Sequence, residues 1–72
     1  MVNLRFNPSN EFERYHSQIP TILRSKKRIE ENKYYLEKVL YRLLDLEDKI
    51  PEKYIPSCKN LQQKIAVKLE VF

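Results

Sequence analysis

The sequence predicts a small all-α protein, a helical bundle of two to three helices around a long central helix. The 72-residue chain contains no glycine, the residue on which tight hairpins and phosphate-binding loops rely. Residues 29–50 carry an almost unbroken heptad of apolar side chains, which is typical of a helix that buries one face. We therefore expect a single small helical domain over residues 1–72.

The size and composition of the chain limit how such a domain is stabilised. A domain of this size buries only about 60% of its unfolded surface, and small folds commonly add disulfides, metal ions or partner chains. Cys58 is the single cysteine and His16 the single histidine, so one chain can form neither a disulfide nor a Cys/His metal cluster. We therefore expect self-association or a protein partner, and no cofactor.

The first helix is expected over residues 7–18. Asn7 and Pro8 fit an N-cap followed by proline at the first helical position. Apolar side chains then recur at steps of three and four, at Phe12, Tyr15, Ile19 and either Ile22 or Leu23. Pro20 interrupts this run, so either the helix ends near Gln18 or one longer helix kinks. The first alternative is favoured.

The central helix is expected over residues 20–50, ending before Pro51, which disfavours helical geometry in the preceding residue. Heptad positions a and d, counted from Ile29, form a seam that is apolar except at Asn32. The apolar seam residues are Ile29, Leu36, Val39, Leu43, Leu46 and Ile50. Such a seam fits the core of a bundle within one chain, and equally a coiled coil between chains.

A third helix is expected over residues 57–70, after a connector with a proline at each end. Ser57 is its expected N-cap. Apolar residues follow at helical spacing, at Cys58, Leu61, Ile65, Leu69 and Phe72. Residues 65–72 also alternate like a strand, as do residues 2–6, so strand pairing between these two segments stays open as an alternative.

A second apolar stripe lies on the central helix, away from the seam. Tyr34 and Tyr41 occupy heptad position f, and Leu44 occupies position b. Tyrosine combines a large apolar area with a hydrogen-bonding end, which suits a partner-binding surface. The alternative is that the first or third helix covers this stripe and makes it part of the core.

Four cations cluster near the expected start of the central helix. They are Arg24, Lys26, Lys27 and Arg28. With a net charge of +4, the chain can attract nucleic acid or an anionic membrane, but neither is required. The cluster carries no interleaved aromatic residue that would stack on bases. It is thus a possible anion-binding site, an acidic-protein contact, or solvated surface.

No catalytic constellation is present, because His16 has no acid or nucleophile at a recognisable spacing. No apolar run approaches the ~20 residues that span a bilayer, and the N-terminus lacks the apolar core of a secretory signal. We expect an intracellular protein, cytoplasmic or nuclear, that is not an enzyme. Its expected role is a helical protein–protein interaction module or a small subunit of a larger complex. The alternative is a small basic nucleic-acid-binding protein that uses the four clustered cations.

Residues 29–69 resemble the BAG domain of cochaperones. The resemblance rests on a long helix that ends in Leu-Leu-Asp-Leu-Glu-Asp-Lys-Ile-Pro-Glu and is followed by a second apolar helix. It implies a three-helix bundle that grips the ATPase domain of a chaperone through charged residues on its last two helices. The last segment lacks the family's basic run followed by an acidic end, so no binding residue is carried over.

Overall fold

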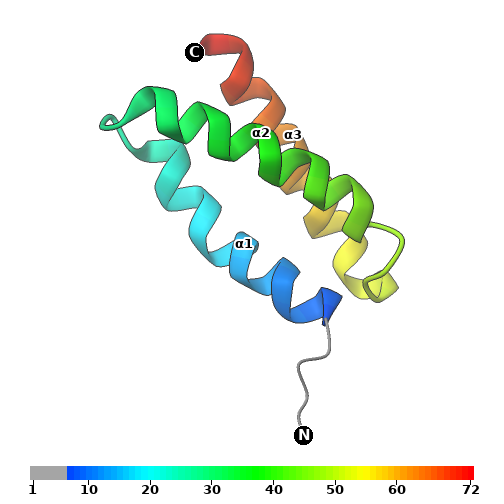
Figure 1. The fold of residues 1–72 in the computed structure, drawn as a ribbon. Helices are drawn as coiled ribbons and strands as arrows, with labels where there is room; N and C mark the ends of the chain where they lie inside the picture. The colour runs from blue at the N-terminus through cyan, green and yellow to red at the C-terminus, as the bar shows by residue number, and fades with distance from the viewer. Residues whose placement is uncertain (1–6) are drawn as a thin grey trace, which may run out of the picture.

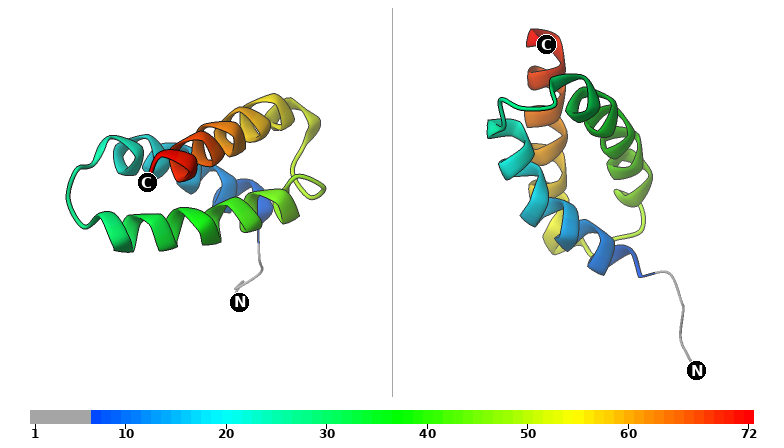
Figure 2. Two further views of the ribbon diagram at one scale, coloured as in Figure 1. Left: turned by 90° about the horizontal axis from the view of Figure 1, so that it is seen from above. Right: turned by 60° about the vertical axis from the view of Figure 1, so that its left-hand side comes forward.

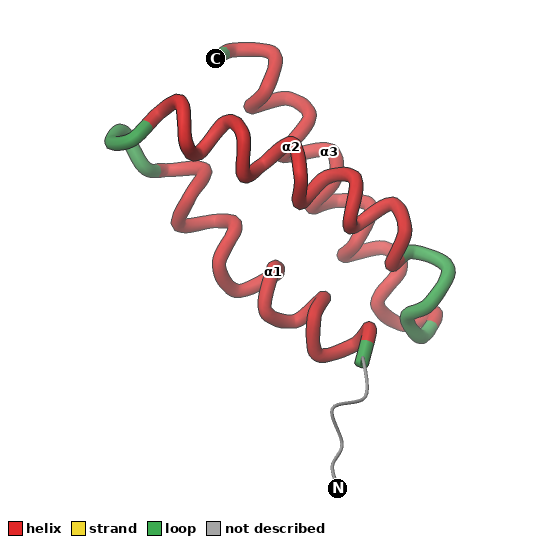
Figure 3. The backbone as a smooth tube through the Cα atoms, viewed as in Figure 1, coloured by secondary structure: helices red, strands yellow, loops and turns green. Residues whose placement is uncertain are grey.

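Three α-helices follow one another in the computed structural model, which describes residues 7–72 (Figure 1). α1 spans Pro8–Arg24, α2 spans Ile29–Leu46 and α3 spans Ile55–Val71, with a 3-10 helix, η1, at Glu52–Tyr54. Each α-helix contacts the other two, and the chain reverses direction at each connection (Figure 2). The described residues contain no strand (Figure 3). The predicted fold class, an all-α bundle, is confirmed.

α1 begins at the predicted cap. The side-chain oxygen of Asn7 accepts hydrogen bonds from the backbone N–H groups of Ser9 and Asn10 at 3.0 and 3.3 Å. These bonds satisfy two of the amides that a helix start leaves without a partner. Pro8 follows in the first turn, where its missing N–H removes no helical bond.

α1 continues through Pro20, so the predicted helix end at residue 18 is wrong. Proline withdraws one helical hydrogen bond, the one to the carbonyl of His16. Apolar contacts on both sides of Pro20 offset that loss, because Ile19 is fully buried and Leu23 packs against the core. Tertiary packing thus overrides a local helix breaker.

The break between the first two helices lies at residues 25–28. The hydroxyl of Ser25 accepts a hydrogen bond from the Lys27 N–H and donates one to the Lys27 carbonyl, each at 3.3 Å. Arg28 then adopts left-handed geometry, with φ 54° and ψ 47°, before α2 begins. The side-chain amide of Asn32 donates to the Lys27 carbonyl at 2.9 Å. This polar seam residue therefore fixes the connection instead of filling the core.

α2 is shorter than predicted, because it begins at Ile29 and ends at Leu46 instead of covering residues 20–50. The chain then turns through residues 47–50. Backbone N–H groups of Lys49 and Ile50 both donate to the Leu46 carbonyl, at 2.8 and 3.1 Å. The turn, and not Pro51 alone, therefore ends the helix.

α3 begins at Ile55, two residues before the predicted start. Its N-cap is Tyr54, without a side-chain hydrogen bond, and Pro56 occupies the first turn, where proline is well tolerated. Ser57 therefore lies inside the helix and does not cap it. The helix extends to Val71, which removes the strand alternative for residues 65–71. The segment 2–6 lies outside the described residues.

The core gathers side chains from all three helices. It consists of Phe12, Ile19, Leu36, Val39, Leu43, Leu46, Ile50, Cys58, Leu61 and Ile65. Five of the six apolar seam residues belong to this set, so the seam forms the core within one chain. The structure does not show the alternative, a coiled coil between chains. The exception is Ile29, which is 41% exposed because it is the first residue of α2 and lies at the end of the bundle.

Candidate interaction surface

The outward side of α2 carries three large, exposed side chains. Tyr34 is 61% exposed, Tyr41 is 74% exposed and Leu44 is 50% exposed. We call these three residues the tyrosine face. On a helix with 3.6 residues per turn they lie away from the buried Leu36 and Leu43. Neither α1 nor α3 covers them, so the stripe seen in the sequence is surface and not core.

Two carboxylates border the tyrosine face. Glu37 lies three residues after Tyr34 and four before Tyr41, and Glu30 lies four residues before Tyr34, so these side chains are neighbours on the helix. Both carboxylates are exposed and form no ion pair with any residue of the described range 7–72. Lys38 reaches over the Tyr34 ring, with its Nζ 4.8 Å from the ring centre. The face thus combines aromatic area with charged side chains of both signs.

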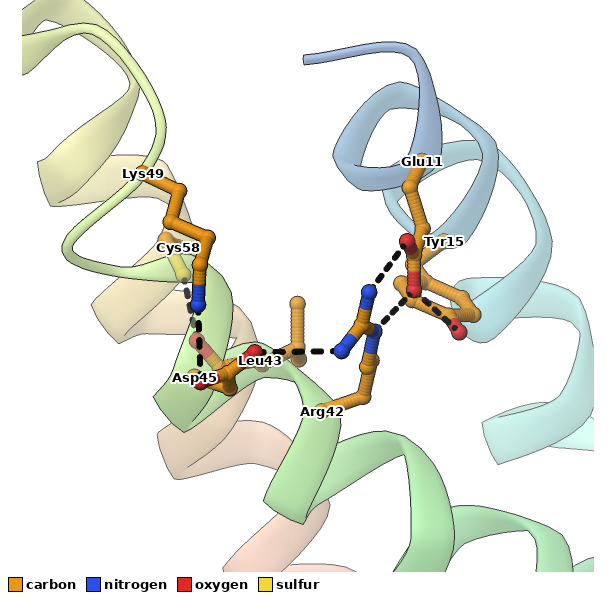
Figure 4. Close-up of polar contacts among 7 residues, drawn as sticks. All are labelled: Glu11, Tyr15, Arg42, Leu43, Asp45, Lys49 and Cys58. Atoms are coloured by element: carbon orange, nitrogen blue, oxygen red, sulfur yellow. Dashed lines mark hydrogen bonds and ion pairs between the residues drawn. The ribbon is translucent and has the colours of Figure 1, made fainter. Parts of the chain in front are cut away.

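A polar cluster centred on Arg42 fixes α2 against α1 (Figure 4). The Arg42 guanidinium donates to both carboxylate oxygens of Glu11, at 2.6 and 3.0 Å, and to Asp45 at 3.0 Å. The Tyr15 hydroxyl also donates to Glu11, at 3.0 Å. The hydrogen bond from Arg42 lowers the pKa of Glu11, although partial burial opposes the shift. Two-point Arg–carboxylate contact of this kind fixes orientation as well as distance.

Sequence reasoning missed this cluster. Glu11 and Arg42 are 31 positions apart, and no sequence pattern indicates that these two residues pair. The local signals lie around Asp45, with Arg42 three residues before it and Lys49 four residues after it. The Lys49 ammonium donates to the Asp45 carboxylate at 2.9 Å.

The opposite flank of α2 is tied to α3. The side-chain amide of Gln62 donates to Glu47 at 2.9 Å and to the Leu43 carbonyl at 3.4 Å. The thiol of Cys58 donates to the same carbonyl at 3.7 Å. Burial raises the pKa of the Cys58 thiol, so little reactive thiolate forms at neutral pH. Cys58 is therefore a packing residue.

The four clustered cations lie at the end of the bundle where α1 passes into α2. Arg24 is the last residue of α1, Lys26 and Lys27 lie in the connection, and Arg28 caps α2. The expectation that they sit within a helix is therefore wrong for three of the four. Arg28 pairs with Glu31, whereas the other three form no ion pair with the rest of the described chain.

α1 and α3 leave a groove between them that sequence reasoning did not find. One part has a volume of about 270 Å³ and is lined by His16, Pro20, Ser57, Asn60, Leu61 and Lys64. A second hollow, of about 410 Å³, adjoins it through Asn60 and Lys64 and is lined further by Leu23, Gln63 and Val67. We call the two hollows together the α1–α3 groove. No residue of α2 and no carboxylate lines it.

Within residues 7–72, no group of three or more His, Cys, Asp or Glu side chains is placed to hold a metal ion. None of the described helices has the length and apolar character needed to cross a bilayer. The chain matches no family model, no curated protein sequence and no solved structure. No family is therefore assigned to it.

Proposed function

We propose that the protein is a non-catalytic helical interaction module, or a small subunit of a larger complex, that docks a protein partner on the tyrosine face. One observation carries this proposal. Tyr34, Tyr41 and Leu44 expose half or more of their surface on one side of α2, although the core is already filled by other residues. Exposed tyrosines grouped on one face are typical of the residues that dominate binding energy at protein interfaces.

The way α2 is held also supports docking. Arg42 joins it to α1 through Glu11, and Gln62 joins it to α3 through Glu47. A helix fixed on both flanks presents its outer side chains in one geometry, so little ordering is required when a partner binds. The tyrosine face is thus a prearranged surface.

The substitution Tyr41→Ala tests this proposal. We expect it to weaken partner binding by about 2 kcal/mol or more, because an interface anchor is removed. The unfolding free energy of the isolated chain should change by no more than about 0.5 kcal/mol, because the side chain is 74% exposed. The immobilised wild-type chain and the variant are compared for proteins retained from an extract of the source cells, and retained partners are then titrated.

Val71→Ala is the matched control, since Val71 is 70% exposed on α3. It should retain the same partner as the wild type. A partner that binds the Tyr41→Ala chain with unchanged affinity would exclude the tyrosine face as its docking surface. Unfolding of the Tyr41→Ala chain would instead place this side chain in the core.

A nucleic-acid-binding role is the second candidate, and the exposed end of the bundle favours it. Arg24, Lys26 and Lys27 are exposed and lack an acidic partner in the described chain. Contacts from such cations to phosphates release counterions, so binding weakens steeply with salt. Gel-shift titration with duplex DNA and with RNA at two salt concentrations separates this role from protein docking. Lys26→Ala should reduce the salt slope by about 1 if that lysine contacts a phosphate.

A further inference from the structure

The charges of the chain are divided unevenly between its helices. Residues 14–29 and 53–69 contain nine of the 14 lysines and arginines and none of the ten aspartates and glutamates. Residues 30–52, which include α2, contain seven carboxylates and four cations. The first two segments cover most of α1 and α3, which contact each other, and their last turns lie at the same end of the bundle (Figure 2). The α1–α3 side is therefore basic, whereas α2 and the turn after it are acidic.

Five cations gather on the α1–α3 side where α1 passes into the connection, and we call them the basic patch. They are Arg24, Lys26, Lys27, Lys64 and Lys68. Lys64 lines the α1–α3 groove, and Lys68 follows it by one turn of α3. Arg24 follows the groove residue Pro20 by one turn of α1. None of the five cations forms an ion pair within residues 7–72.

The carboxylates closest to the patch in the sequence leave it unneutralised. Glu31 pairs with Arg28 at the start of α2. Glu30 borders the tyrosine face on the outward side of α2. Glu70 is the single carboxylate of α3, and it lies about 100° round that helix from the next residue, Val71. The patch therefore keeps its positive charge for an anionic partner.

Exposed aliphatic side chains lie beside these cations. Val67 is 54% exposed and Val71 is 70% exposed, and the two are neighbours one turn apart on α3. Val67 lines the same hollow as Leu23 of α1 and Lys64. Aliphatic area and unpaired positive charge therefore share one surface of the bundle.

We propose that the protein docks on an anionic lipid bilayer through this surface, with the basic patch at the lipid phosphates and Val67 and Val71 in the headgroup region. Clustered lysines and arginines are attracted to an anionic leaflet, and exposed apolar side chains add to binding when they enter the interface. The valines favour lipid over nucleic acid, because aliphatic side chains offer no aromatic ring on which bases stack. The proposal goes beyond the proposed function, since the bound bilayer leaves the tyrosine face on α2 accessible.

Cosedimentation with lipid vesicles tests the proposal. We expect the chain to bind vesicles of phosphatidylcholine with about one third phosphatidylserine, and to bind pure phosphatidylcholine about 10-fold more weakly or less. Added salt should weaken binding to the anionic vesicles, because it screens the attraction. Equal binding to the two kinds of vesicle overturns the proposal, and so does a lack of binding to the anionic ones.

Two double variants with the same change in net charge locate the contact. Lys27→Ala/Lys64→Ala removes two cations of the basic patch and should lower partitioning onto anionic vesicles about 30-fold. Lys38→Ala/Lys53→Ala removes two exposed cations from α2 and η1 and should bind like the wild type. Circular dichroism confirms that each variant is folded. Equal losses in the two variants would show that net charge alone drives binding, which overturns the assignment to this surface.

A third variant distinguishes a bilayer from nucleic acid. Val67→Ser/Val71→Ser keeps every charge and should lower partitioning onto anionic vesicles about 10-fold, because aliphatic contact with lipid is lost. Unchanged vesicle binding by this variant overturns the proposal. A wild-type chain that shifts duplex DNA or RNA in a gel but does not bind anionic vesicles also overturns it and assigns the basic patch to nucleic acid.

The vesicle experiment and the capture experiment fail independently. Tyr41→Ala should bind anionic vesicles like the wild type, because its side chain lies on α2 outside the basic patch. A chain that does not bind vesicles leaves the tyrosine face as the proposed docking surface for a protein. Loss of vesicle binding in Tyr41→Ala would place the lipid contact on α2 and overturn the assignment to the α1–α3 side.

Discussion

The two sides of α2 both carry an apolar stripe, but the two stripes have opposite surroundings. Leu43 is fully buried against the other helices, whereas the next residue, Leu44, is 50% exposed. Both leucines belong to regular apolar stripes in the sequence. The contrast shows that periodicity identifies the faces of a helix, while the number of neighbouring helices decides how many of them are covered. Here α1 and α3 cover one side, and the other side stays exposed.

The largest expected effect comes from truncating the buried Leu43, and its exposed neighbour Leu44 is the comparison. Leu43→Ala should lower the unfolding free energy by about 2–5 kcal/mol, because it removes buried contacts and leaves a cavity. Leu44→Ala should lower it by no more than about 0.5 kcal/mol. Urea denaturation followed by circular dichroism measures both values. Similar losses at the two positions would mean that the sides of α2 do not differ as described.

A smaller effect is expected at the contact that holds α2 on α1. Glu11→Gln keeps the shape of the side chain but removes the charge that faces Arg42. Because the side chain of Glu11 is 13% exposed and that of Arg42 is 37% exposed, solvent screens part of the interaction. The loss in unfolding free energy at neutral pH should therefore be about 1 kcal/mol. Glu52→Gln, in the exposed η1 turn, is the control and should change little.

The contact between Glu11 and Arg42 should also make the unfolding free energy depend on pH. The contact with Arg42 lowers the pKa of Glu11 below its ordinary value of 4.5. A carboxylate with a lowered pKa in the folded state stabilises the protein above its unfolded pKa, and this contribution is lost as pH falls through the folded pKa. The stability gap between wild type and Glu11→Gln should thus be constant near neutral pH and close below pH 4.5. A gap that persists unchanged in acid would contradict the assignment.

The sequence predicts those features that depend on local pattern. Asn7 caps α1 as expected, and the seam is buried from Leu36 on α2 to Ile50 in the turn after it. The position of the tyrosine face followed from the same heptad. The heptad did not predict that this face is exposed, because its exposure depends on where α1 and α3 pack.

The features that the sequence does not predict depend on distant contacts. Pro20 lies inside a helix because Ile19 is buried beside it, and the pairing of Glu11 with Arg42 joins segments that only the fold brings together. The α1–α3 groove likewise exists only once both helices are in place. The sequence also does not predict the left-handed geometry at Arg28. Glycine usually marks such positions, and this chain contains none.

The smallest expected effect concerns Arg28, which sets where α2 begins and hence which residues fall on its two sides. Left-handed geometry costs a non-glycine residue about 1–2 kcal/mol, and glycine avoids this cost but loses more backbone entropy on folding, about 0.5–1 kcal/mol. Arg28→Gly should therefore be more stable than Arg28→Ala by about 0.5 kcal/mol. Both variants lose the pair with Glu31, so their difference isolates the backbone. Thermal denaturation of the two chains measures it. An alanine variant as stable as the glycine variant would show that α2 begins elsewhere in solution, and the division between its buried and exposed sides would then shift with it.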